Sequence, residues 1–205
     1  MTIRMMLVRP VSKSKIYLSK FIALNILVIS PIILLELINF LIFGCTMGFE
    51  NPLLPNIVGA RYQNDIVNGF SLVSGSIHLI PIWKTLVGGM TLQIIYIICS
   101  CAFIMMISTV TKNSIFSISI SFTICVILSL FINIISRIGT KFIKLLYSLI
   151  FTCYFDGIAV VTGDLSKIMK VPKITVSYSV ILMLAQGITF YIIGSFVFKK
   201  NNDLI

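Results

Sequence analysis

Glu36 is the residue whose position most clearly indicates a chemical role. It is the one charged residue in the apolar run Phe21–Gly44, and a carboxylate placed within hydrocarbon is a functional candidate by default. Asn25 lies eleven residues before it, about three helical turns, and Asn39 follows near the same face. Two interpretations stay open: a functional carboxylate with a partner in the helix bundle, or a protonated carboxyl hydrogen-bonded to a neighbouring helix.

No other group in the sequence assembles into a catalytic or metal-binding set. His78 is the only histidine, and a lone histidine without a carboxylate or cysteine set favours a structural role. The sequence has no phosphate loop, no HExxH and no GxSxG motif, and its five cysteines have no metal spacing. We therefore expect no enzyme, no metal and no cofactor; Cys45 and Cys153 remain candidates for a disulfide near the outer interface.

The composition requires a membrane. The 205 residues are 58% hydrophobic and 11% charged, whereas soluble domains carry roughly 25% charge. A helix over Phe21–Gly44 would be about 36 Å long, enough to cross a bilayer core of roughly 30 Å. We predict an all-α, polytopic transmembrane bundle formed by one membrane domain, with interfacial or re-entrant segments beside four spans at about 21–44, 86–110, 114–136 and 174–198.

A basic stretch, Met1–Lys20, precedes the first span and contains no acid. Ile3, Met6 and Leu7 share one helical face, which predicts a short amphipathic helix that ends at Pro10. Ser12 is suited to cap the helix that follows. The net charge of +10 lies beside apolar spans without interleaved aromatic residues, so it favours contact with the lipid bilayer over nucleic acid.

The third span carries a stripe of small and polar residues at helical spacing. Such residues mark faces where helices approach closely in lipid. The stripe is therefore interpreted as a packing face within the subunit or across a dimer, with a solute-lining face as the sharper alternative. Its members are Ser114, Ser117, Ser121, Cys125, Ser129 and Asn133.

Two further segments do not fit ordinary loops. The weakly apolar stretch 66–82 is broken by Gly and Pro, and we expect it to lie at the interface. The extracellular region 137–173 contains the apolar run Leu145–Phe155, which is too short to span as a helix and predicts a re-entrant or interfacial element.

The sixteen Lys and Arg residues divide equally between the two sides of the membrane. The first segment usually dominates orientation, so both termini are expected to be cytoplasmic in the cell membrane.

The segment Arg9-Pro-Val-Ser-Lys-Ser-Lys-Ile-Tyr-Leu-Ser-Lys20 resembles a segment of bacterial ABC transporter permeases of the second export class, the drug and peptide export type. Ser108–Ser114 is similar to their short cytoplasmic turn, and the ending Val197–Ile205 resembles their tail. Members of this family have six spans, and the resembling segment follows their second span. The chain is therefore expected to lack the first two spans of the family pattern.

The resemblance implies that the chain works together with partner proteins. It implies a membrane-spanning permease subunit that pairs with a second permease copy or paralogue and with a separate ABC ATPase subunit, which hydrolyses ATP and drives alternating access. Met1–Pro10 matches the family's coupling helix that docks on the ATPase. The residues expected to meet the ATPase are Arg4, Arg9, Pro10, Ser12, Lys13 and Lys15. The alternative is a small membrane scaffold or immunity protein without ATP coupling, in which Met1–Lys20 holds anionic lipid.

Overall fold

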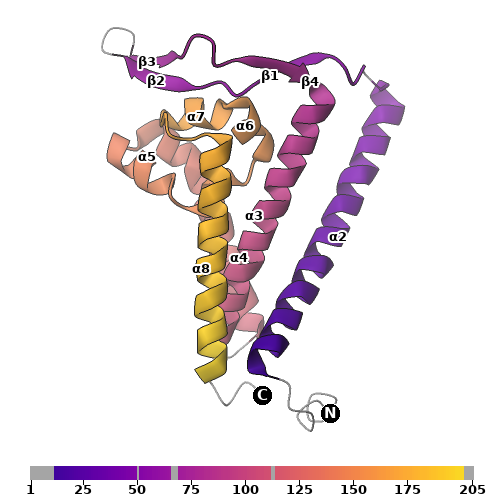
Figure 1. Ribbon diagram of the computed structural model, residues 1–205, viewed down its shortest axis with the longest axis vertical. Helices are drawn as coiled ribbons and strands as arrows, with labels where there is room; N and C mark the ends of the chain where they lie inside the picture. Colours follow the sequence, from indigo (N-terminus) through magenta and orange to yellow (C-terminus); the bar gives the residue numbers. More distant parts are fainter. Residues whose placement is uncertain (1–11, 50, 66–68, 112–113, 201–205) are drawn as a thin grey trace.

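The computed structural model describes residues 12–49, 51–65, 69–111 and 114–200. Four long helices run up, down, up and down through it: α2 (Lys13–Met47), α3 (Ile82–Thr111), α4 (Ser114–Ile138) and α8 (Val176–Lys200). Each of the four is long and apolar enough to cross a membrane, which confirms the all-α bundle and the membrane protein predicted from the sequence. Both ends of the described chain lie at the same end of the bundle (Figure 1), here called the terminal end; the opposite end is the distal end.

All four helices end one to three residues beyond the predicted spans, and α2 and α3 also begin earlier, whereas α8 begins two residues later than predicted. Helix α2 starts directly after Ser12, which has extended backbone, and Gly48 at φ 88° follows its last residue. Pro31 lies inside α2 without interrupting it, and prolines are more common in membrane-spanning helices than in soluble ones. The 35 residues of α2 give a rod of about 52 Å.

Helix α3 is the centre of the bundle and contacts α2, α4, α6 and α8. Its packing on α6 (Gly157–Thr162) depends on glycine: a Cβ atom at Gly157 would collide with the carbonyl oxygen of Gly89. Helix α2, by contrast, contacts only α3 and α8 closely among the described elements, and Figure 1 shows it leaning away from α3 towards the distal end.

The stretch between α2 and α3 folds into an arm of four short strands across the distal end (Figure 1). Strand β1 (Pro55–Val58) pairs antiparallel with β4 (His78–Pro81), and β2 (Tyr62–Asp65) pairs with β3 (Gly69–Leu72). The interpretation of 66–82 as a broken interfacial segment missed this pairing. Its glycines and prolines mark turns and strand ends, as at Gly75 with φ 80°, because Gly supplies the positive φ that tight turns need.

The region 137–173 forms three short helices and one 3-10 turn at the distal end, beneath the arm. These are α5 (Lys141–Tyr147), η1 (Phe151–Tyr154), α6 and α7 (Asp164–Met169). The N-caps Thr140 and Asp156 accept hydrogen bonds from the backbone N–H groups of Ile143 and Ala159. The amine of Lys144, buried at 8% exposure, donates to the carbonyl of Ser136 at 2.7 Å, so it satisfies an acceptor in the last turn of α4.

The apolar run 145–155 packs inside the bundle instead of lying flat upon it. All four residues of η1 are buried, and η1 contacts α3, α4 and α8. Gln186, in the middle of α8, holds the irregular backbone: its Oε1 accepts from the N–H of Phe151 at 2.9 Å, and its Nε2 donates to the carbonyl of Leu149. Irregular backbone at membrane depth persists only where such groups are paired inside the protein.

The cysteines form no disulfide, so the pairing of Cys45 with Cys153 does not occur. Cys45 is exposed near the distal end of α2, while Cys153 is completely buried in η1. Burial raises the pKa of the Cys153 thiol to about 12, so this thiol stays protonated at neutral pH and is a poor nucleophile.

Single-cysteine variants should report this difference. With only Cys45 retained, a maleimide reagent should label the solubilised protein, because this thiol is exposed. With only Cys153 retained, labelling should stay close to background between pH 7 and pH 9, because the thiol is completely buried and its raised pKa keeps it neutral. Rapid labelling of Cys153, followed by mass spectrometry, would mean that η1 is open to solvent.

Replacing Gln186 with Leu should destabilise the bundle by about 1–3 kcal/mol, because it leaves the N–H of Phe151 and the carbonyl of Leu149 unpaired beside apolar surroundings. Thr189→Val is the matched control: its hydroxyl bonds only to Ala185 one turn earlier on the exposed side of the same helix, so a change within about 0.5 kcal/mol is expected. Unfolding in mixed SDS and mild detergent measures the stability of both variants. Equal losses of stability in the two variants would argue against a stabilising role for the Gln186 hydrogen bonds.

Candidate functional site

Tyr17 fixes the terminal end of α2 to the rest of the bundle. Its side chain has 0% exposure, and its ring centroid lies 5.3 Å from that of Tyr191 and 5.4 Å from that of Phe198, both on α8. A Cβ atom at Gly194 would collide with the Tyr17 hydroxyl oxygen, so α8 offers a glycine-lined seat for this ring. The second turn of α2 is thereby wedged into α8.

Basic side chains surround this seat at the terminal end. Lys13 Nζ donates to the carbonyl of Lys199 at 3.4 Å, and Lys20 Nζ lies 5.3 Å from the centroid of the Phe198 ring. Lys15, Lys199 and Lys200 are exposed. Together these five lysines form a cationic rim around the ends of α2 and α8.

The predicted ATPase-facing residues fall partly on this rim. Ser12 is exposed and its side chain makes no capping hydrogen bond, Lys13 is half-buried, and Lys15 points to solvent. Arg4, Arg9 and Pro10 lie outside the described residues. Of the predicted coupling segment, the structure therefore describes only the part from Ser12 onwards, at the start of α2. The coupling helix itself stays a prediction.

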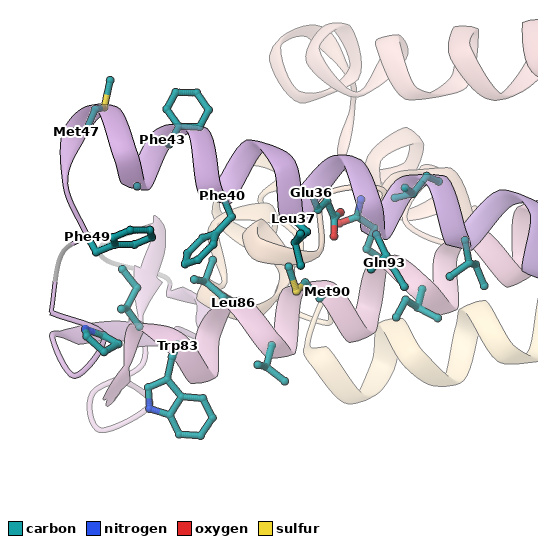
Figure 2. A pocket seen from close by; sticks show the side chains of 18 of the residues that line it. Glu36, Leu37, Phe40, Phe43, Met47, Phe49, Trp83, Leu86, Met90 and Gln93 are labelled. Atoms are coloured by element: carbon teal, nitrogen blue, oxygen red, sulfur yellow. The ribbon is translucent and has the colours of Figure 1, made fainter.

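A large groove lies between α2 and α3 in their distal halves. This groove has a volume of about 960 Å³ and extends from Ile29 and Ile97 to Phe49 and Trp83. Its walls are almost wholly apolar and are rich in aromatic rings near the distal opening (Figure 2). Phe40 and Phe49 contact each other there, with ring centroids 5.5 Å apart.

Glu36 and Gln93 are the two polar aliphatic side chains of the groove. They come from opposite walls, α2 and α3, and Figure 2 shows them pointing towards one another. Glu36 is half-buried, and no Lys, Arg or His within 4 Å forms an ion pair with it among the described residues. The structure thus places the carboxylate on a concave apolar surface.

The two asparagines predicted to share a face with Glu36 do not join it in the groove. Asn25 is buried near the terminal end, where its Nδ2 donates to the carbonyl of Phe21 at 2.8 Å, and its Oδ1 has no partner among the described residues. Asn39 is exposed. A shared helical face on α2 did not produce a shared site because α2 touches its neighbours over only part of its length.

The polar stripe of α4 is partly buried within this chain. Ser117 and Ser121 have 0% exposure, and the Ser121 hydroxyl donates to the carbonyl of Ser117 at 2.7 Å. Cys125 packs against the main apolar core, and Ser129 is half-buried. The side chains of Ser114 and Asn133 lie outside the described ones. The middle of the stripe therefore faces helices of the same subunit.

Three residues with notable contacts in the structure were not selected from the sequence: Tyr17, Gln93 and Gln186. A usable signal existed for the two glutamines, because a strongly polar side chain within a span is rare and usually finds a partner. Tyr17 gave no such signal, since its importance comes from the glycine that faces it on α8, 177 residues later in the sequence. His78 is exposed on β4.

One family model matches residues 1–204, and its description reads "Protein of unknown function (DUF2705)". A search of curated proteins and a search of solved structures each found no match. The match covers nearly the whole chain, from the basic stretch to the cationic rim.

Variants of Tyr17 should separate the contribution of its ring to stability from that of its hydroxyl. Tyr17→Ala should destabilise the protein by about 3–5 kcal/mol, because it empties a fully buried aromatic site. Tyr17→Phe should change stability by less than about 1 kcal/mol, since the hydroxyl has no hydrogen-bond partner among the described residues. Thermal unfolding in detergent compares the two variants, and a large loss in Tyr17→Phe would reveal a hydrogen bond to the hydroxyl.

Proposed function

The chain belongs to the DUF2705 family, which has no assigned activity, and we propose that it is the membrane-spanning permease subunit of an ATP-binding cassette exporter in the cell membrane. A separate ATPase subunit hydrolyses ATP, and the chain moves a solute by alternating access together with a second permease copy or paralogue. The chain itself is not an enzyme. Its resemblance to export permeases in Arg9–Lys20 and the arrangement of α2 support this proposal.

The observation that carries the proposal is the attachment of α2. This helix is continuous through 35 residues and starts at Lys13, within the basic stretch Met1–Lys20. Its Tyr17 is completely buried against α8 at Gly194, a residue that also approaches Met106 of α3. A push on the segment before Ser12 would therefore reach two other spans within two helical turns. Rigid-body movement of packed helices is a common way to convert a local push into a change of access.

The cationic rim fits the same assignment. The Lys and Arg residues divide equally between the two sides, but the first basic segment usually dominates orientation, so in this proposal the terminal end, with both termini, faces the cytoplasm. An ATPase that docks there would meet five lysines on α2 and α8. The arm of β1–β4 and the helices α5–α7 would then face outwards.

The test is whether the full chain binds and regulates an ATPase. Co-expressed with the phosphate-loop ATPase of its gene neighbourhood, the tagged full-length chain should copurify with that ATPase in detergent and alter its rate of ATP hydrolysis. Neutralising Arg9→Gln together with Lys13→Gln should lower the recovered ATPase at least tenfold, because it removes two charges from the docking end.

Lys167→Gln with Lys170→Gln is the matched control, since it removes the same charge from the distal end and should leave recovery unchanged. Labelling of Cys45 by a membrane-impermeant maleimide on intact cells checks that the orientation is kept in every variant. Absence of any copurifying ATPase would count against the permease. If the neutralised variant changed lipid association alone, the scaffold or immunity alternative would be favoured.

A further inference from the structure

Glu36 lies far from either membrane surface. It follows Lys20, at the terminal end of α2, by sixteen residues, or about 24 Å of helix. Gln93, on the facing wall, follows the Trp83–Lys84 pair at the distal boundary by nine residues, or about 13 Å. The carboxylate is therefore near the middle of the hydrocarbon, where an uncompensated charge is expensive.

The four described spans supply no counter-charge at that depth, either in this chain or in a second copy of it. The four spans contain no lysine or arginine between their flanking residues, in the ranges 21–47, 86–111, 114–136 and 174–198. A lysine side chain reaches only a few ångströms towards the membrane centre from a helix end. A cation that meets Glu36 must therefore arrive on another molecule.

The shape of the groove indicates what kind of molecule that is. Apolar and aromatic side chains continue from Glu36 to the distal opening, including Leu37, Phe40 and Phe43 on α2 and Leu86 and Met90 on α3 (Figure 2). The volume of about 960 Å³ is at the upper end of the range for small-molecule sites. One negative group at the end of a long apolar wall complements a ligand with one positive group and a long apolar body.

We propose that the α2–α3 groove binds a cationic amphiphile. Its ammonium group donates hydrogen bonds to the Glu36 carboxylate and to the amide oxygen of Gln93, and its apolar tail lies along the wall from Leu37 to Phe49. A phospholipid is a poorer occupant because its phosphate would face Glu36. A second copy of the chain would cover the apolar wall and leave the carboxylate unpaired.

The inference goes beyond the permease assignment, because binding at equilibrium needs no ATPase. The experiment uses the full-length chain in nanodiscs of zwitterionic lipid, with radiolabelled dodecylammonium and its neutral twin dodecanol as probes and empty nanodiscs as the baseline. The wild-type chain should retain dodecylammonium at least tenfold more strongly than dodecanol. Glu36→Gln should abolish this preference without weakening dodecanol binding.

Two further variants make the result specific to the groove. Asp164→Asn removes the same charge from an exposed residue at the distal end and should keep the ammonium preference. Met90→Trp adds bulk beside Glu36 and should reduce the binding of both probes. Helix content and SDS unfolding confirm that each variant is folded before binding is measured.

The outcomes decide between the occupants. Equal retention of the two probes by the wild-type chain would overturn the proposal and identify the groove as a seat for neutral acyl chains. An ammonium preference that persists in Glu36→Gln would also overturn it. Efficient crosslinking between copies through Phe40→Cys, in a chain with no other cysteine, would assign the groove to a dimer interface instead.

Discussion

The absence of water in hydrocarbon is the constraint on which this structure depends. It forces the chain into helices, since only there are backbone groups paired within one segment. Among the described residues, the irregular backbone at the turn into η1 is stabilised by Gln186, which pairs with the carbonyl of Leu149 and the N–H of Phe151 on either side of the turn. A single side chain from the last helix thereby allows the chain after α4 to enter the bundle and fill the space between α3, α4 and α8.

That filling makes the bundle asymmetric. Helices α3, α4 and α8 enclose η1, and most of the buried apolar residues belong to this group. Helix α2 is outside it: the most apolar window of α2 is 0% buried. Its terminal end is fixed by Tyr17, and its distal half stands apart from α3 across the groove. The polar groups of that half, Glu36 among them, are therefore available to molecules from the membrane.

The sequence predicted the features that depend on local pattern. Long apolar runs located the four spans, and Leu145–Phe155 was correctly set apart as too short to span. The arm of β1–β4 was missed because a few residues of strand between glycines and prolines look like a broken helix, and pairing such as Pro55 with Pro81 is set by distant partners. Glu36 was identified from its chemistry alone, whereas its companion Gln93 required the packing of α2 against α3.

The two ends of α2 are connected by one rigid element, and this links the two proposals. A rotation of α2 about the Tyr17 seat would barely move the cationic rim but would shift the distal half by several ångströms, because the helix is about 52 Å long. The width of the groove and the distance from Glu36 to Gln93 would change together. A ligand held between those two side chains would then prefer one position of α2, and by reciprocity that position would be favoured when the ligand is bound. Coupling between the terminal end and the groove thus requires no pathway through the packed core, only the stiffness of one helix.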